Sequence, residues 1–414
     1  MVFQKNKTES AKELTFPGDK SIAHRLVLIS LILNKKILIK NLPQGQDVLT
    51  SLSIIKQLGC KVTNENQDFI IDGTHIPTYP APITLNCRNS GTTARLLCGI
   101  LANMKGNFKL IGDESLSKRP MNRVTKPLSE MMGIDITSTN GHLPVFISAT
   151  ETSKSIKFNN ITGSAQVKSA ILFAGIAANG ITEVIEKIPS RDHTERLLKY
   201  INTLPKGNCL EFNIPGDISS AAYFIVDAII NRQNIIIKNI LLNPTRIGFI
   251  RVLKRMGAKI SETVLSDQWE PVGNIEINPC NLAATNIMPE EIPSLIDELP
   301  ILAVAMCFAR GKSTVTGAEE LRVKESDRIS CLISQLKAVG VECSEQQDGY
   351  TISGYTNFKD AELDSFGDHR LAMSFAILAK NADSKISLKN SDSVEISFPD
   401  FFQKLSSTAL TAHA

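Results

Sequence analysis

Six segments of the chain are apolar at nearly every position, and each begins at a polar or glycine-rich turn. An α-helix without a polar face must be buried on all sides. The pattern therefore predicts buried helices at residues 22–34, 93–103, 165–178, 218–230, 296–309 and 371–379.

Between these segments lie stretches that are apolar on one helical face only. They predict amphipathic helices at residues 47–58, 122–132, 244–256 and 324–339. Each of the four ends near a glycine placed as a helix C-cap requires, namely Gly59, Gly133, Gly257 and Gly340. A short run that alternates apolar and polar residues follows each glycine, which indicates a half-buried strand. One structural plan, with three units in each half of the chain, accounts for this order.

The chain also repeats itself in sequence. PGDKS at 17–21 recurs as PGDIS at 215–219, an offset of 198, and Gly59 and Gly257 keep the same offset. GNFKLIG at 106–112 matches GKSTVTG at 311–317, an offset of 205. Because the matches form an ordered series, they indicate two duplicated halves. The 414 residues also exceed what one hydrophobic core usually serves, so we predict two α/β domains with buried helices inside and sheets outside.

Composition narrows the class of protein. The chain is 43% hydrophobic and 21% charged, with a formal net charge of +3, which does not favour a nucleic-acid-binding surface. No run of about 18 apolar residues predicts a membrane span, and the first residues lack the apolar core of a secretory signal. The eight cysteines are scattered and the histidines lack metal-ligand spacing, so we expect reduced thiols, no bound metal and a cytoplasmic enzyme.

Polar residues gather in the first turns of the predicted buried helices. Serine, aspartate and glycine there are common helix caps, which is one interpretation of these turns. Helix N-termini are also anion sites, because their N–H groups are unpaired and carry partial positive charge. Capping does not explain the basic residues in these turns, since burying an unpaired charge costs several kcal/mol. An anionic ligand would neutralise these cations: Lys20, Arg25, Arg95, Lys168 and Arg370.

Two further segments carry candidate chemistry. Asp297 opens an apolar helix and is placed to act as a general base if it faces cations across a cleft. Lys324 and Arg328 are four residues apart and are expected to share a helix face, with Glu325 one step round. A solvated, ion-paired face is the alternative interpretation of that segment. P-loop and dinucleotide-binding motifs do not occur, so the residues indicate phosphate-handling catalysis by cations and carboxylates.

Taken together, these motifs resemble the enolpyruvyl transferases, and most closely the 5-enolpyruvylshikimate-3-phosphate (EPSP) synthases. The resemblance spans nearly the whole chain in the family's order. It rests on PGDKSIAHR (17–25), NSGTTARLL (89–97), GDESLSKRPM (112–121), GSAQVKSA (163–170), PGDISSAA (215–222), IDELPILAVA (296–305), EELRVKESDRI (319–329) and GDHRLAMS (367–374).

The resemblance implies a two-domain inside-out α/β barrel of six repeats that closes around its substrates. The implied domains are residues 16–212, and residues 1–15 together with 213–414, with the substrate cleft between them. The implied reaction transfers the enolpyruvyl group of phosphoenolpyruvate to the 5-hydroxyl of shikimate 3-phosphate and releases phosphate. It belongs to the shikimate pathway, which leads to chorismate and aromatic amino acids. The resemblance implies no cofactor, and we expect a monomer without nucleic-acid or membrane partners.

The resemblance also implies roles for individual residues. The catalytic residues would be Lys20, Asp297 and Glu325. Shikimate 3-phosphate would contact Lys20, Ser21, Arg25, Ser164, Ala165, Gln166, Ser190, Arg191, Asp297 and Lys324. Phosphoenolpyruvate would contact Lys20, Gly91, Arg119, Gln166, Arg328 and Arg370.

Two alternatives remain open. A UDP-N-acetylglucosamine enolpyruvyl transferase would share the fold, but that branch typically uses a cysteine near the second basic motif. The segment 106–121 contains no cysteine here. A catalytically inactive anion-binding protein of the same fold is the other alternative. Such a protein would have no need for Lys20, Asp297, Glu325 and Arg370 together.

Overall fold

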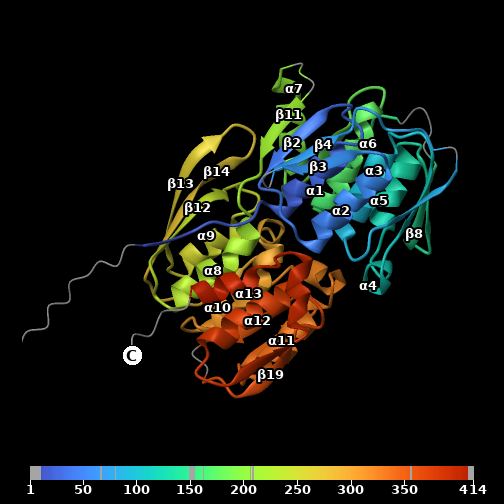
Figure 1. Ribbon diagram of the computed structural model, residues 1–414. Helices are drawn as coiled ribbons and strands as arrows, with labels where there is room; N and C mark the ends of the chain where they lie inside the picture. Colours follow the sequence, from blue (N-terminus) through green and yellow to red (C-terminus); the bar gives the residue numbers. More distant parts are fainter. Residues whose placement is uncertain are drawn as a thin grey trace, which may run out of the picture.

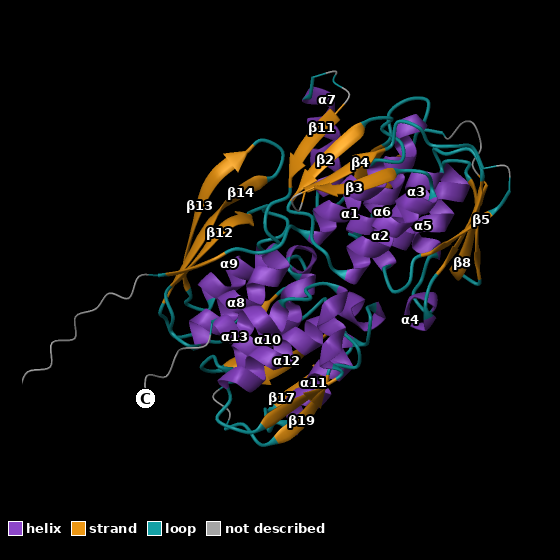
Figure 2. Ribbon diagram, in the orientation of Figure 1, coloured by secondary structure: helices purple, strands orange, loops and turns teal. Residues whose placement is uncertain are grey.

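The chain forms two lobes, each with helices at its centre and β-sheets outside them (Figure 1). The computed structural model describes residues 11–65, 68–79, 81–148, 154–161, 163–205, 207, 209–354 and 357–408. Figure 2 shows the two groups of helices, each flanked by strands on its outer sides. This is the predicted inside-out arrangement. Within the described ranges, no helix is long and apolar enough to cross a membrane.

Three helices form the centre of the first lobe, and side chains all round them are buried. They are α1 (Lys20–Ile29), α3 (Gly91–Leu101) and α6 (Ala165–Ala174). The helices beside them are α2 (Gln46–Gln57), the short α4 (Glu114–Ser117), α5 (Asn122–Lys126) and α7 (His193–Thr203).

Two four-stranded sheets and one two-stranded sheet cover these helices. The first sheet has the order β11 (Cys209–Asn213), β2 (Lys36–Lys40), β4 (Asp68–Asp72), β3 (Lys61–Glu65). The second has the order β5 (Ile83–Asn86), β6 (Asn107–Ile111), β8 (His142–Ser148), β7 (Asp135–Thr139). The third pairs β10 (Glu183–Ile185) with β9 (Lys157–Asn159).

The second lobe repeats this architecture. Its central helices are α8 (Ile218–Ile230), α10 (Leu299–Cys307) and α12 (His369–Asn381). Its outer helices are α9 (Gly248–Arg255), α11 (Arg328–Ala338) and α13 (Phe401–Ser407). The four-stranded sheets are β1 (Lys12–Leu14), β12 (Ile235–Leu241), β14 (Pro271–Asn278), β13 (Lys259–Asp267), and β15 (Asn286–Ile287), β16 (Lys312–Val315), β18 (Gly349–Ser353), β17 (Cys343–Gln346). The pair is β19 (Ala361–Asp364) and β20 (Ile386–Lys389).

The repeated unit is a buried helix, a strand, an outer helix and an antiparallel hairpin. Units that begin at α1, α3, α8 and α10 contain all four parts. Within the described residues, the units that begin at α6 and α12 have no antiparallel hairpin, and their sheets have two strands. The predicted plan of three units in each half is confirmed, and the third unit of each half differs from the other two in this hairpin.

Two strands each pair with a sheet of one lobe, while the helix that follows them lies in the other lobe. β1, near the start of the chain, pairs in parallel with β12 of the second lobe. β11 pairs in parallel with β2 of the first lobe. The chain segments that follow these strands meet, because the Asp19 N–H donates to the Pro215 carbonyl and the Asp217 N–H donates to the Pro17 carbonyl, each at 2.8 Å. Both copies of the repeated PGD motif therefore lie at the crossing point between the lobes.

Several predicted helix boundaries need correction. The helix predicted from residue 22 to 34 ends at Ile29, because Asn34 adopts the left-handed conformation before β2. Pro127 divides the helix predicted at 122–132 into α5 and a π-helical turn. The helices predicted from 244 and 296 begin at Gly248 and Leu299. The four predicted C-cap glycines all have positive φ, between 71° and 103°, which confirms them.

Candidate active site

The starts of the central helices combine capping with cavity lining. The Asp19 carboxylate accepts a hydrogen bond from the Ile22 N–H at 2.9 Å, and the Ser90 hydroxyl accepts one from the Thr93 N–H at 3.3 Å. The residue that follows each cap, Lys20 or Gly91, lines a cavity between the lobes. Capping is therefore confirmed and compatible with anion binding, because a cap fixes the turn while its neighbours face the cavity. Anion binding at these turns stays a prediction.

This cavity has a volume of about 410 Å³ and is built from both lobes. It brings together every residue that the sequence assigned to catalysis or substrate binding. These are Lys20, Ser21, Arg25, Gly91, Arg119, Ser164, Ala165, Gln166, Ser190, Arg191, Asp297, Lys324, Glu325, Arg328 and Arg370. Their grouping shows where they lie, and their individual roles stay predictions.

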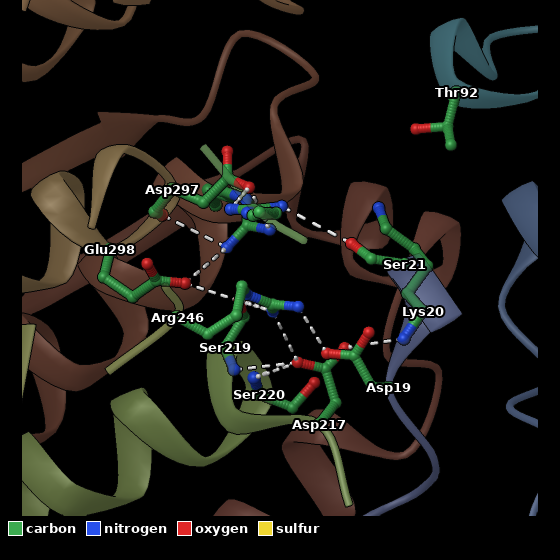
Figure 3. Close-up of polar contacts among 12 residues, drawn as sticks. Asp19, Lys20, Ser21, Thr92, Asp217, Ser219, Ser220, Arg246, Asp297 and Glu298 are labelled. Carbon is green, nitrogen blue, oxygen red and sulfur yellow. Dashed lines mark hydrogen bonds and ion pairs between the residues drawn. The ribbon is translucent and has the colours of Figure 1, made fainter. Parts of the chain in front are cut away.

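One predicted helix start does not reach the cavity. Ser219, in the first turn of α8, is 4% exposed and donates a hydrogen bond to the Glu298 carboxylate at 2.5 Å. The start of α8 therefore packs behind the cavity wall (Figure 3). The start of α8 therefore differs from the starts of α1, α3, α6 and α12, which line the cavity.

The cavity concentrates positive charge in a nearly neutral protein. Lysine and arginine outnumber aspartate and glutamate ten to five among its lining residues. Such a surface of cations in a partly closed space attracts small, multiply charged anions.

Arg25 is a cavity cation without a carboxylate partner among the described residues. Its guanidinium donates to the Thr194 hydroxyl at 2.8 Å, the Ser169 hydroxyl at 2.7 Å and the Ser21 carbonyl at 2.7 Å. Burial lowers the pKa of Arg25 to about 10. The site therefore holds this cation in place at an electrostatic cost that a bound anion would offset.

Arg95 has the same character. It donates to the Gln166 side-chain oxygen at 2.7 Å and to the Pro120 carbonyl at 3.2 Å, both uncharged acceptors. Burial and, to a smaller extent, the neighbouring Arg119 and Arg123 guanidiniums lower its pKa to about 9. From the sequence, Arg95 was predicted to need an anionic ligand, but it was not assigned to either substrate.

Two other predicted cations are neutralised within the protein. The Lys20 ammonium lies 3.0 Å from the Asp47 carboxylate, at the edge of the cavity. The Lys168 ammonium lies 2.8 Å from both Glu186 and Glu195, and its side chain does not line the cavity. The expectation that Lys168 awaits an anionic ligand is therefore wrong.

Asp297 contacts cations from both lobes. Its carboxylate lies 2.5 Å from Arg191, 3.4 Å from Arg370 and 3.6 Å from Arg328. Burial works to raise the pKa of Asp297, but Arg370 and Arg191 outweigh burial and hold that pKa well below its usual range. Asp297 is therefore ionised and able to accept a proton.

Glu325 is held in a similar way. One carboxylate oxygen lies 3.2 Å from Arg119 of the first lobe, and the other lies 2.5 Å from Arg328. Burial raises the pKa of Glu325, yet Arg328 and Arg119 together hold it well below its usual range. Its ionised form therefore depends on two arginines that an anionic ligand would compete for.

Lys324 and Arg328 do not share a helix face. α11 begins at Arg328, where Asp327 caps it, and Lys324 has extended backbone before the helix. Both side chains still line the cavity, because the extended segment approaches it before the helix turns away. Burial lowers the pKa of Lys324 to about 8, although Asp297 opposes that shift.

The cavity also contains residues that were not predicted from the sequence. Arg123 donates to both carboxylate oxygens of Glu320 across the cleft, at 3.0 and 3.1 Å. His369 has no hydrogen-bond partner on either ring nitrogen among the described residues. Burial and Lys20 lower the pKa of His369 well below its usual range, so its ring is neutral. Arg123 lies in a second basic cluster next to Arg119, which was the only signal for it in the sequence.

Comparison with known proteins points in one direction. The sequence model of the family described as EPSP synthase (3-phosphoshikimate 1-carboxyvinyltransferase) matches residues 5–405. A 3-phosphoshikimate 1-carboxyvinyltransferase of Leuconostoc citreum is 43% identical, over 96% of each chain. A crystal structure of EPSP synthase from Acinetobacter baumannii is 35% identical, with a TM-score of 0.83 over 97% of this chain and 96% of that one.

A third comparison concerns the fold alone. The enolpyruvyl transferase NikO from Streptomyces tendae is 13% identical, with a TM-score of 0.73 over 97% of this chain and 95% of that one. The architecture is thus shared with a protein whose sequence has diverged almost completely.

Proposed function

The chain belongs to the EPSP synthase (3-phosphoshikimate 1-carboxyvinyltransferase) family, and from this premise we propose how its cavity residues divide the reaction between them. The enzyme transfers the enolpyruvyl group of phosphoenolpyruvate to the 5-hydroxyl of shikimate 3-phosphate and releases phosphate, as a step of aromatic amino acid biosynthesis. One observation carries the proposal: both lobes contribute cations and ionised carboxylates to one cavity that holds every predicted residue.

Shikimate 3-phosphate binds mainly to the first lobe. Its phosphate takes the N–H groups and hydroxyls at the start of α6, together with Ser190 and Arg191, because a helix start and a guanidinium both favour an anion. Its ring and hydroxyls lie against Lys20, Ser21 and Arg25 on one side and Ser164, Ala165, Gln166, Asp297 and Lys324 on the other. The absence of a carboxylate partner for Arg25 among the described residues supports this placement.

Phosphoenolpyruvate binds between the lobes, where arginines of both lobes meet. Arg119, Arg328 and Arg370 hold its carboxylate and phosphate, since planar guanidiniums pair with such groups in a bidentate manner. Lys20 and Gln166 bridge the two substrates, and Gly91 leaves the space for this ligand. A Cβ at Gly91 would lie 3.0 Å from the Arg119 Cζ and the Arg95 Nη1, which supports close approach at this point.

Asp297 acts as the base for the attacking hydroxyl. The 5-hydroxyl oxygen forms a bond to C2 of phosphoenolpyruvate and loses its proton to Asp297, while C3 gains a proton. The resulting tetrahedral intermediate then loses phosphate and one C3 proton to give the enol ether. The low pKa keeps Asp297 ionised but weakly basic in the free enzyme, and its basicity rises when substrate anions take Arg191 and Arg370, because these cations hold the pKa down.

Glu325, with Lys20, carries the proton at C3. In the free enzyme Arg119 and Arg328 keep Glu325 ionised. When the carboxylate and phosphate of phosphoenolpyruvate take these guanidiniums, the pKa of Glu325 rises, because opposite charges no longer favour its ionised form. The second substrate thereby prepares the group that protonates it.

The two lobes close as domains around the substrates. We propose residues 16–212 as one domain and residues 1–15 with 213–414 as the other, residues 1–10 lying outside the described ranges. The ion pairs of Arg191 with Asp297 and of Arg119 with Glu325 cross the cleft and support closure on this axis. Closure assembles cations from both domains only where ligand charge offsets them.

We further propose a cytoplasmic monomer that needs no cofactor. One chain supplies all the predicted catalytic and binding residues of the cavity, which supports a monomer. Arginine and lysine supply the charge stabilisation that a metal would otherwise give. The described cysteines are free thiols, which is typical of a reducing compartment.

Phosphate release by the purified protein tests the proposal. The protein is given phosphoenolpyruvate, without added metal, and either shikimate 3-phosphate or UDP-N-acetylglucosamine. We expect release only with shikimate 3-phosphate. Release only with the sugar nucleotide would contradict the proposed acceptor, shikimate 3-phosphate, but not the fold. Release with neither acceptor would favour an inactive anion-binding protein.

A further inference from the structure

Arg246 lies outside the cavity, yet it joins the elements that carry the cavity's reactive groups. It occupies the turn before α9 and is 2% exposed. Figure 3 shows its guanidinium above the neighbouring side chains of Asp19 and Asp217, one from each copy of the repeated PGD motif, with Ser219 to the left. None of the motifs found in the sequence includes this residue.

The guanidinium makes three close contacts with three different helix starts. Its Nη1 donates to the Asp19 carboxylate at 2.7 Å and lies 3.0 Å from the His193 Nε2. Its Nη2 donates to the Ser219 hydroxyl at 2.9 Å. These partners belong to the starts of α1, α7 and α8, so one side chain ties both lobes together.

Each contact leads directly to a residue of the proposed reaction. Asp19 is followed by Lys20. His193 lies two residues after Arg191. The Ser219 hydroxyl, held by Arg246, donates to Glu298, which follows Asp297. Arg246 is thus linked within two residues to Lys20, Arg191 and Asp297.

The surrounding hydrogen bonds fix the direction of these contacts. A guanidinium only donates, so the His193 Nε2 accepts and its Nδ1 carries the proton. That Nδ1 lies 2.6 Å from the Glu270 carboxylate, to which it donates. The other Glu270 oxygen accepts from the Asn243 amide at 2.8 Å, in the same turn as Arg246. The hydrogen bonds thus run from Arg246 through His193 and Glu270 back to Asn243 in the same turn. This network holds the guanidinium in one orientation.

We infer that Arg246 is a positioning residue of the reaction, which sets Lys20 and Arg191 of one lobe against Asp297 of the other. The inference rests on the proposed function. It follows from chemistry that only arginine provides, because one planar group donates in several fixed directions at once. A lysine at this position offers a single ammonium and cannot reach all three partners in the same geometry.

Kinetics of Arg246→Lys and Ser219→Ala test the inference. We expect Arg246→Lys to lower kcat by about 30-fold or more, since displacement of a reacting group by about 1 Å costs on the order of 10²-fold. The affinity for shikimate 3-phosphate, measured by calorimetry, should change less than about fivefold, because many other groups share that binding. Ser219→Ala removes the hydroxyl that accepts from Arg246 and donates to Glu298, and it leaves the contacts of Arg246 with Asp19 and His193 in place. We expect about a fivefold loss of kcat with KM unchanged.

Matched variants separate positioning from general loss of structure. Arg255→Gln, at the end of α9, breaks an exposed ion pair with Glu291. Ser220→Ala changes the residue beside Ser219. Both should retain wild-type kinetics. If Arg246→Lys fails to fold, Ser219→Ala decides the matter. A kcat within about threefold of wild type in Arg246→Lys, or unchanged in Ser219→Ala, would overturn the inference, whereas an inactive wild type would instead contradict the proposed function.

Discussion

The chain starts its first and fourth central helices with the same motif, but only the first of these starts faces the cavity. Asp19 and Asp217 both cap their helices with a side-chain oxygen. The next residue is Lys20 in one copy and Ile218 in the other. Lys20 lines the cavity, whereas Ile218 is fully buried in the core. The cap gives both helices the same start. The residue after the cap decides whether that start faces the cavity or packs into the core.

The two halves also balance charge differently. Arg25 and Arg95 of the first lobe donate only to uncharged groups among the described residues. Arg328 of the second lobe pairs with Asp368 at 2.7 Å and Glu325 at 2.5 Å, and Arg370 lies 3.4 Å from Asp297. In the first lobe, Arg25 and Arg95 thus lack carboxylate partners among the described residues, although Lys20 and Lys168 have them. In the second lobe, carboxylates hold the arginines for which the substrates compete.

The largest effect is expected from making the first copy of the motif resemble the second. Lys20→Met should lower kcat by about 10²-fold or more, because the ammonium contacts both substrates in the proposed reaction. Steady-state phosphate release measures the loss. Ile218→Met makes the matching change at the equivalent position, where a similar volume is buried, and should retain activity. Near-normal turnover in Lys20→Met, or equal losses in both variants, would contradict the comparison.

Removal of an unneutralised cation should affect binding without lowering stability. Arg95→Gln is expected to raise the KM for phosphoenolpyruvate by about tenfold, since Arg95 lies beside Gly91 and Arg119 of the proposed phosphoenolpyruvate site and its positive charge is lost. Its unfolding temperature without ligand should not fall, because burial already disfavours this cation. Arg328→Gln, in contrast, leaves Asp368 without its arginine and Glu325 with Arg119 alone, and should destabilise the protein by about 3–5 kcal/mol. A fall in the unfolding temperature of Arg95→Gln as large as that of Arg328→Gln would show that the charges of the two lobes are not balanced differently.

A smaller change tests the space beside these arginines. Gly91→Ala places a methyl group 3.0 Å from the Arg119 Cζ and the Arg95 Nη1, so both guanidiniums must shift by a few tenths of an ångström. We expect the KM for phosphoenolpyruvate to rise about fivefold and the affinity for shikimate 3-phosphate to stay unchanged. Equal weakening of both substrates would place Gly91 outside the phosphoenolpyruvate site.

The smallest effect concerns pH. Lys324 has a pKa of about 8 in the folded protein and a usual value of 10.5, so the unfolded chain binds more protons between these two pH values. The free energy of unfolding should therefore rise with pH from about 8 to 10.5 in the absence of ligand. Chemical denaturation at several pH values measures the slope. Lys324→Met should reduce that slope, while Lys337→Met, an exposed lysine change on α11, should leave it unaltered.

Much of the fold follows from the sequence because it is encoded in local patterns. Helices without a polar face had to lie inside, and the C-cap glycines Gly59, Gly133, Gly257 and Gly340 all adopt the predicted conformation. Helix starts were predicted less well, because the helical spacing of apolar residues extends toward the N-terminus beyond the true starts. α11 begins only after its cap Asp327, and α10 begins at Leu299. Hydrophobic spacing does not record these interruptions.

Site residues could be predicted from the sequence where they belong to a motif. They could not be predicted where their role depends on a partner that lies far away along the chain. Every residue that a motif assigned to catalysis or substrate binding lines the cavity. Lys168 was misjudged because Glu186 and Glu195, which neutralise it, lie outside its motif. Arg246 was missed for a related reason, since its hydrogen-bond partners lie far along the chain. His369 was missed because its character comes from burial, without a hydrogen-bond partner among the described residues.

Calorimetric titration of shikimate 3-phosphate into Arg25→Gln and Lys168→Gln tests most directly whether the first lobe reserves its unneutralised cations for substrate. Arg25 has no carboxylate partner among the described residues, whereas Lys168 lies 2.8 Å from two. The account predicts that Arg25→Gln weakens binding by at least about tenfold at an unchanged unfolding temperature. Lys168→Gln should lower the unfolding temperature and leave the affinity within about fivefold of wild type. The reverse pattern, or equal loss of affinity in both variants, would contradict the account.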